Sequence, residues 1–197
     1  MLNENFVFVG IAINAVGLLS YFLDTIRGKI QPNKVSFALW SIAPIVAFFA
    51  QISQGVGVQS LMTLSVGLFP IIIFLGSFVN KKAYWKITKF DLSCGGLSLI
   101  GLLLWQITSI GNLAIFFSIL ADGSAYIPTL KKSWSHPESE SGWPWFAVAI
   151  NGLFALLTLK SFNFANSSFP AYFLIINLLT FVVIQFKVGK HFAIEKK

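Results

Sequence analysis

The chain has 197 residues, of which 56% are apolar and 11% are charged, and its net charge is +7. Soluble domains carry about 25% charged residues, so this composition excludes a soluble globular enzyme and a disordered chain. The single cysteine excludes an internal disulfide and a cysteine-rich metal site. The composition indicates an all-α integral membrane protein.

Seven apolar runs are long enough to be membrane-spanning helices, which need about 20 mostly apolar residues. In chain order they cover residues 5–24, 35–53, 58–79, 92–109, 112–131, 143–160 and 168–187. The fifth run is the weakest, because Asp122 interrupts it and Pro128 lies near its end. The alternative is a soluble protein with seven buried helices, but too little polar sequence remains to cover such a core. The sequence therefore predicts seven transmembrane helices.

The positively charged residues are distributed unevenly between the connections. Thirteen of the 14 Lys and Arg residues fall in the first, third and fifth connections and in the C-terminal tail, and only Lys160 falls on the opposite side. Cytoplasmic loops carry an excess of Lys and Arg, which predicts an outside N-terminus and a cytoplasmic C-terminus. The charge then faces anionic lipid rather than nucleic acid. No targeting sequence or signal-peptide cleavage site is recognisable, and we expect the protein in a bacterial inner membrane.

Two parts of the sequence are similar when the chain is shifted by 105 residues. Residues 21–50 and 126–155 align without a gap and share seven identities, where composition alone gives about two or three. The identical pairs are Tyr21/Tyr126, Pro32/Pro137, Ser36/Ser141, Trp40/Trp145, Ile45/Ile150, Phe49/Phe154 and Ala50/Ala155. Four crossings separate the copies, so both point the same way. This predicts two parallel three-helix bundles, residues 1–82 and 111–197 with the cytoplasmic tail, joined by a linker helix within 83–110.

The end of the fifth run carries a recognisable frame. It reads Tyr126-Ile127-Pro128-Thr129-Leu130-Lys131-Lys132-Ser133 and is followed by Ser141-Gly142. This frame resembles the PQ-loop signature, in which a Pro-Gln pair near a helix end precedes basic residues and a Ser. With the 3+1+3 layout, the chain resembles the PQ-loop/SWEET-like seven-helix transporter superfamily. Its members include SWEET sugar carriers, lysosomal amino-acid exporters, vitamin carriers and the KDEL receptor.

The chain departs from the signature at identifiable positions. Thr129 replaces the Gln of the pair, and Leu23-Asp24 replaces the whole pair in the first copy. The resemblance implies a substrate asparagine in the third and the seventh helix of a sugar carrier. Asn177 matches the second of these, but its counterpart in the first copy is Ile72. The resemblance therefore implies the superfamily and not a sugar substrate.

Four polar side chains fall near the middles of their runs and are predicted to bind the substrate: Asn14, Asp122, Asn151 and Asn177. Polar groups at this depth are costly and usually face the bundle interior. A protonatable carboxylate there suggests proton coupling, although Ser118 or Ser124 could simply hold Asp122. Each asparagine could instead only bond neighbouring helices.

Aromatic and proline residues complete the predicted site. The resemblance implies that Trp40 and Trp145 form stacking walls, whereas their depth also fits an interfacial aromatic belt. Proline removes a backbone hydrogen bond and lets a helix bend, so Pro44 and Pro128 are predicted hinges. We assign the repeat-related Tyr21 and Tyr126 to the same gating region.

The favoured function is a transporter of a small polar solute, such as a sugar, an amino acid or a vitamin-like compound. It would work by alternating access between the two bundles, as the resemblance implies. A receptor or scaffold of the same fold is the alternative. An enzyme is not predicted, because Asp122 is the one ionisable group at mid-membrane depth. We predict no cofactor, metal or nucleic-acid partner, only the solute and the lipid bilayer, and leave a homo-oligomer open.

Overall fold

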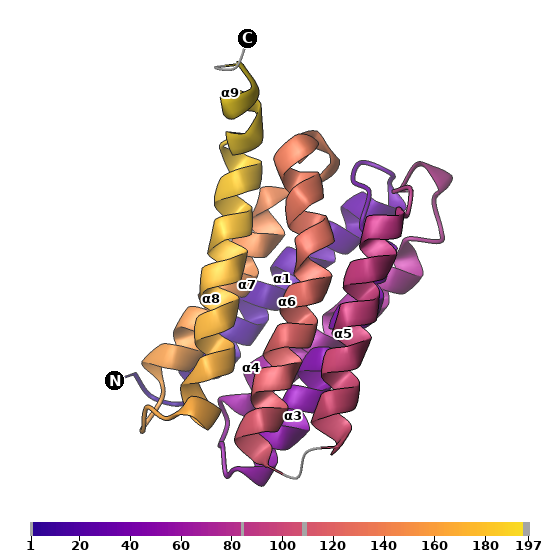
Figure 1. The fold of residues 1–197 in the computed structure, drawn as a ribbon. Coiled ribbons are helices and arrows are strands. Elements are labelled where there is room, and N and C mark those ends of the chain that lie inside the picture. Colours follow the sequence, from indigo (N-terminus) through magenta and orange to yellow (C-terminus); the bar gives the residue numbers. More distant parts are fainter. Residues whose placement is uncertain (1, 84, 108–109, 195–197) are drawn as a thin grey trace.

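The computed structural model describes residues 2–83, 85–107 and 110–194, and within them every regular element is helical. Long helices lie side by side along one axis (Figure 1). Their bounds are α1 (Phe6–Ile26), α2 (Lys34–Trp40), α3 (Ala43–Ser53), α4 (Ser60–Gly76), α5 (Lys89–Ile107), α6 (Gly111–Ser135), α7 (Gly142–Leu157), α8 (Phe164–Gln185) and α9 (Val188–Ile194). Single turns of 3-10 helix, η1 (Lys81–Ala83) and η2 (Pro137–Ser139), lie in two connections.

Over the described residues, each of the seven predicted apolar runs falls on helical structure, with ends shifted by a few residues; residues 108–109 of the fourth run lie outside the described residues. Four segments are long and apolar enough to cross a membrane: Phe6–Ile26, Lys34–Ser53, Gly111–Ser135 and Phe164–Gln185. The helices Ser60–Gly76 and Gly142–Leu157 are apolar but shorter. Length and composition of these helices indicate a membrane protein.

The second predicted run is two helices rather than one. α2 ends at Trp40 and α3 begins at Ala43, with Pro44 in the first turn of α3. A proline ring clashes with the carbonyl four residues earlier, which here belongs to Trp40, the last residue of α2. The break therefore follows from Pro44.

The weakest predicted run forms the longest helix. α6 has 25 residues and continues to Ser135, with Pro128 inside it. The basic residues assigned above to the fifth connection are Lys131, the last residue of the predicted run, and Lys132, and this assignment was wrong, because both belong to the last turns of α6. Lys132 is buried there beside an acidic partner, described below. The opposite charge of this partner offsets part of the cost of removing the ammonium from water.

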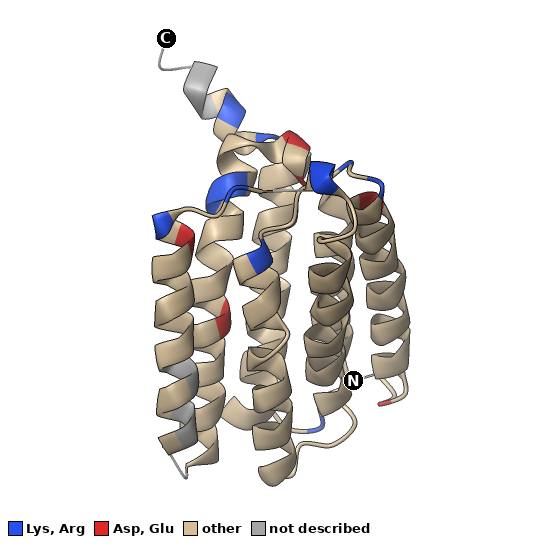
Figure 2. Cartoon of the chain, turned by 90° about the vertical axis from the view of Figure 1, so that its right-hand side faces the viewer, with Lys and Arg blue, Asp and Glu red and all other residues tan. Residues whose placement is uncertain are grey.

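Charged residues lie mainly at the ends of the bundle. Figure 2 shows Lys and Arg gathered at the end where the C-terminus lies, while the helices between the ends are mostly uncharged. At the other end, Lys160 Nζ lies 2.8 Å from Glu4 Oε2. Two of the predicted C-terminal charges, Lys196 and Lys197, lie outside the described residues. Large apolar side chains are exposed along the helices, among them Val16, Phe49 and Ile175.

The packing brings distant parts of the chain together. α1 packs against α4 and α7, α6 packs against α2, α3, α5 and α8, and α7 packs against α8. Small residues allow the closest approaches. A Cβ on Gly152 of α7 would lie 2.8 Å from the Pro170 carbonyl of α8, and one on Gly17 of α1 would lie 2.5 Å from Ala147 Cβ of α7. These contacts place the repeat-related segments around a common interior.

Candidate functional site

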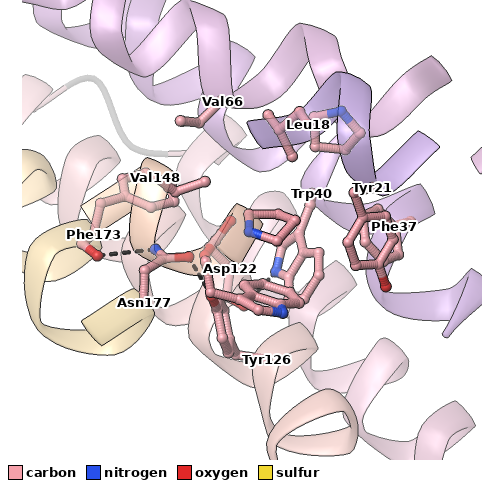
Figure 3. Close-up of a pocket in the computed structure, with 13 residues that line it drawn as sticks. Leu18, Tyr21, Phe37, Trp40, Val66, Asp122, Tyr126, Val148, Phe173 and Asn177 are labelled. Atoms are coloured by element: carbon pink, nitrogen blue, oxygen red, sulfur yellow. Dashed lines mark hydrogen bonds between the residues drawn. The ribbon is translucent and has the colours of Figure 1, made fainter. Parts of the chain in front are cut away.

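One buried cavity receives side chains from both halves of the chain. We call it the central cavity; thirteen residues from α1, α2, α4, α6, α7 and α8 line it (Figure 3). Its aromatic residues are Tyr21, Phe37, Trp40, Tyr126, Trp145 and Phe173, its polar ones are Asp122 and Asn177, and aliphatic residues and prolines form the rest. The volume of the cavity, measured as the space in which the centre of a water molecule fits, is about 40 Å³. A single water needs about 10–15 Å³ on this measure, so the cavity holds a group of a few heavy atoms.

The repeat-related aromatic residues meet at this cavity. The Trp40 ring centroid lies 4.6 Å from that of Tyr126 and 5.7 Å from that of Trp145. Tyr126 and Trp145 are 5.6 Å apart, and Tyr21 lies 6.1 Å from Trp145 with its ring edge-on. Aromatic pairs favour tilted or edge-on arrangements at these separations. Four predicted site residues, two from each copy, therefore form one aromatic wall.

Trp40 and Trp145 are buried, with exposed fractions of 5% and 6%. This placement disagrees with an interfacial aromatic belt, whose members reach the membrane surface. The Trp40 indole Nε1–H donates to the Asp122 backbone carbonyl at 3.2 Å. The Trp145 Nε1 is buried without a hydrogen-bond partner. A buried donor of this kind is unusual and marks a place where a ligand could bond.

The Asp122 side chain is wholly buried and lines the cavity. The Tyr172 hydroxyl of α8 donates to Asp122 Oδ2 at 2.7 Å, while Oδ1 has no hydrogen-bond partner. The sequence suggested Ser118 or Ser124 as the holding group. Ser118 instead donates to the Ala114 carbonyl at 2.9 Å, and Ser124 donates to Leu120 at 2.8 Å. Helical serines commonly bond back to the carbonyl four residues earlier, which removes them from the carboxylate.

Asn177 lies beside Asp122 and Tyr126 in the cavity (Figure 3). The Tyr126 hydroxyl donates to Asn177 Oδ1 at 2.6 Å, and Asn177 Nδ2 donates to the Phe173 carbonyl at 2.9 Å. Both ends of the amide are therefore fixed. Asn177 also holds the Tyr126 ring in its place on the aromatic wall.

Asn14 and Asn151 lie elsewhere in the bundle interior. Neither is among the residues that line the central cavity. Both donate through Nδ2 to the Ser65 hydroxyl, at 3.4 Å and 3.2 Å. Ser65 in turn donates to the Met62 carbonyl at 2.7 Å. This cluster joins α1, α4 and α7. Asn14 and Asn151 therefore bond neighbouring helices, which is the alternative to a substrate-binding role.

The predicted hinge prolines lie outside the cavity lining, whereas Pro70 and Pro144 line it. Pro128 is buried inside α6, and Pro44 begins α3. Tyr21, assigned to gating, is buried and lines the cavity. Its hydroxyl donates to Glu140 Oε2 at 2.8 Å.

Glu140 belongs to a buried charged cluster that the sequence did not reveal. The Lys132 ammonium forms an ion pair with Glu140 and also donates to the Gln31 carbonyl. The side chains of Lys132 and Glu140 are 1% and 0% exposed. We call Lys132, Glu140 and Tyr21 the buried triad. Lys and Glu between two apolar runs normally indicate a solvated loop, so only the tertiary fold shows this cluster.

Comparison of the chain with protein-family models, with curated proteins and with solved structures finds no match. Within the described residues, no three His, Cys, Asp or Glu side chains gather closely enough to hold a metal ion. Over the described residues, the fold and the central cavity define a helical protein with an apolar exterior and an aromatic interior site.

Proposed function

We propose that this protein is a membrane transporter of a small polar solute, which works by alternating access between two three-helix bundles. The bundles are α1–α4 and α6–α8, with α5 as the linker, in the 3+1+3 plan of the PQ-loop/SWEET-like proteins. The N-terminus is outside and the C-terminus cytoplasmic, in a bacterial inner membrane. The solute occupies the central cavity, between the bundles.

One observation carries this proposal. Tyr21 and Trp40 of the first copy contact Tyr126 and Trp145 of the second copy in the wall of one cavity. The packing is reciprocal as well, because α1 contacts α7 while α6 contacts α2 and α3. Parallel repeats with a site at their interface are a known transporter plan. The charge asymmetry in Figure 2 supports the orientation.

Asp122 supports proton coupling. It is a buried carboxylate in the cavity wall, with one oxygen that makes no hydrogen bond. Ionisable groups inside membrane bundles commonly serve proton relays. A proton bound to this oxygen neutralises the Asp122 carboxylate. Because that changes the charge of the cavity wall that the solute contacts, proton binding and solute binding are coupled there.

The buried triad favours a second candidate, a receptor that binds a ligand without transporting it. Tyr21 lines the cavity and is held by Glu140, which Lys132 neutralises. A bundle that stays fixed at this point would bind a ligand and release it on the same side.

A two-stage experiment tests the proposal. Purified protein is screened by thermal shift against sugars, amino acids, nucleosides, vitamins and amines, at acidic and neutral pH. The most stabilising solute is then used in counterflow assays with proteoliposomes. We expect saturable flux that is accelerated by the same solute on the far side and is lost in Trp145→Leu. Saturable binding without flux would favour the receptor.

The same assay tests coupling to protons. Asp122→Asn is expected to remove the pH dependence of flux. Asp24→Asn is the matched control, since Asp24 lies at the end of α1, 3.4 Å from Lys29, outside the cavity. Unchanged pH dependence in Asp122→Asn would exclude this carboxylate as the coupling group.

A further inference from the structure

We infer that the central cavity binds a methylated ammonium head group, so that the transported solute is a small organic cation. This inference names the solute class of the proposed transporter and therefore rests on the cavity being the solute site. It is carried by the aromatic wall, by the carboxylate beside it and by the scarcity of free hydrogen-bonding groups.

The aromatic wall has the composition of a cation-binding cage. Trp40, Tyr126 and Trp145 have mutual centroid distances of 4.6 to 5.7 Å and are inclined to each other by 50–75°. All three rings line the central cavity. A cation within about 6 Å of an aromatic face is attracted by the ring quadrupole, and tryptophan is the strongest partner. The attraction grows when water is excluded.

The carboxylate beside this cage has no cationic partner among the residues that line the cavity. None of the thirteen lining residues is Lys or Arg. The buried cation Lys132, ten residues further along α6, forms its ion pair with Glu140. Tyr172 bonds one oxygen of Asp122, and the other has no hydrogen-bond partner. A buried charge without a partner is costly, and a cationic ligand beside Asp122 Oδ1 would remove that cost.

The remaining polar atoms favour a methylated ammonium over a primary one. A primary ammonium has three N–H donors that need acceptors. Asp122 Oδ1 could accept from one of them. The Asn177 amide is already bonded to Tyr126 and Phe173 at its two ends, and most of the other lining residues are apolar or aromatic, so the three donors outnumber the unbonded side-chain acceptors. A buried donor without an acceptor is unfavourable, whereas methyl groups pack against aromatic faces. The small cavity volume limits the head group to a few heavy atoms.

Three compounds of similar shape test this inference on the wild-type protein. Choline carries a trimethylammonium group, 3,3-dimethyl-1-butanol replaces its nitrogen by carbon without charge, and ethanolamine carries a primary ammonium. Isothermal titration of the detergent-purified protein gives their affinities. We expect choline to bind about tenfold or more tightly than the neutral isostere, with ethanolamine weaker than choline. Equal affinities of choline and the isostere, or no choline binding, would overturn the inference.

Two pairs of variants locate the binding. Asp122→Asn is expected to weaken choline binding toward that of the isostere, with the cation–π part retained, and to leave isostere binding within about twofold, while Asp24→Asn changes neither. Trp145→Leu is expected to weaken choline binding, whereas Trp143→Leu, on the same helix but exposed and outside the cavity, is not. Choline binding that survives both cavity substitutions would place the cation elsewhere and overturn the inference. The wild-type comparison stands even if a cavity variant does not fold.

Flux measurements separate this inference from the proposed function. Choline binding at the cavity without choline counterflow would keep the cation site and reject transport. Counterflow of a neutral solute, with no choline binding, would keep transport and reject the cation site. Counterflow of choline that depends on Asp122 and Trp145 would support both.

Discussion

At the scale of single residues, the buried triad and the exposed charges near it differ in environment. Lys132 and Glu140 form a fully buried ion pair, whereas Lys190 and Glu138 form an exposed one, with Nζ 2.8 Å from Oε2. Breaking a buried pair leaves an uncompensated charge. Exposed pairs lie in water and are screened by salt. The two acidic residues are only two positions apart, which makes them a matched pair.

We expect Glu140→Gln to lower the free energy of unfolding by about 3–5 kcal/mol, because the Lys132 charge stays buried without its partner. Glu138→Gln is the control and should cost about 0–1 kcal/mol. Thermal and denaturant unfolding in detergent measures both. Similar effects of the two substitutions would contradict the buried placement of Glu140.

Tyr172 is the residue that donates a hydrogen bond to Asp122, and no feature of the sequence indicated it. We expect Tyr172→Phe to destabilise the fold by about 1–3 kcal/mol, because a buried carboxylate oxygen loses its donor. Ser118→Ala and Ser124→Ala should have smaller effects, since each removes only a bond to its own helix backbone. A serine variant that matched Tyr172→Phe would restore the sequence-based assignment. Unfolding curves of the three variants decide between them.

Residue types alone predicted part of the cavity. Asp122 and Asn177 line it, because polar groups at depth are costly facing lipid. Trp40 and Trp145, which the family resemblance implied, line it too. Asn14 and Asn151 follow the same rule and still lie outside it. Depth along a helix does not say which neighbouring side chain completes a hydrogen bond. Ser65, which bonds both asparagines, has no feature in the sequence that marks it.

At the scale of elements, the apolar runs predicted helical segments, and four of these are long and apolar enough to cross a membrane. The errors lie where tertiary contacts decide the backbone. Pro44 divides the second run into α2 and α3, and α6 continues past its apolar part to Ser135. The last turns of α6 are stabilised by the contact of Lys132 with Glu140, which periodicity does not show.

The contact between α7 and α8 depends on Gly152. A Cβ at this position would lie 2.8 Å from the Pro170 carbonyl, which is backbone and cannot turn away. We expect Gly152→Ala to lower stability by about 1–3 kcal/mol through this overlap. Gly96→Ala in α5 is the control, because nothing lies within 4 Å of an added Cβ there. It should be neutral or slightly stabilising, since alanine favours helix. Equal melting temperatures of both variants would contradict the close approach.

At the scale of the whole molecule, the repeat is the feature that the sequence predicted most usefully. A shift of 105 residues paired Tyr21 with Tyr126 and Trp40 with Trp145, and all four line one cavity. The buried triad breaks this relation, because it joins Tyr21 to Lys132 and Glu140 while Tyr126 bonds Asn177. No repeat argument could predict it.

The proposed orientation is testable by labelling. In a Cys94→Ser background, Lys160→Cys should react with a membrane-impermeant maleimide added to intact cells, because Lys160 lies at the end assigned to the outside. Lys82→Cys, at the opposite end, should react only after the cells are opened. Both side chains belong to exposed connections. Labelling of Lys82→Cys in intact cells, with Lys160→Cys protected, would reverse the proposed topology.

The burial of Trp40 and Trp145 in the cavity wall has a spectroscopic consequence. Indole emission depends on the polarity and charge around the ring. Two of the six tryptophans, Trp40 and Trp145, line the cavity, and Trp40 also bonds the Asp122 backbone carbonyl. A solute that enters the cavity changes the surroundings of these two indole rings. The protein should therefore report its own occupancy as a change in intrinsic fluorescence, without any attached dye. Trp134 and Trp143 are more exposed and contribute a background that occupancy leaves constant.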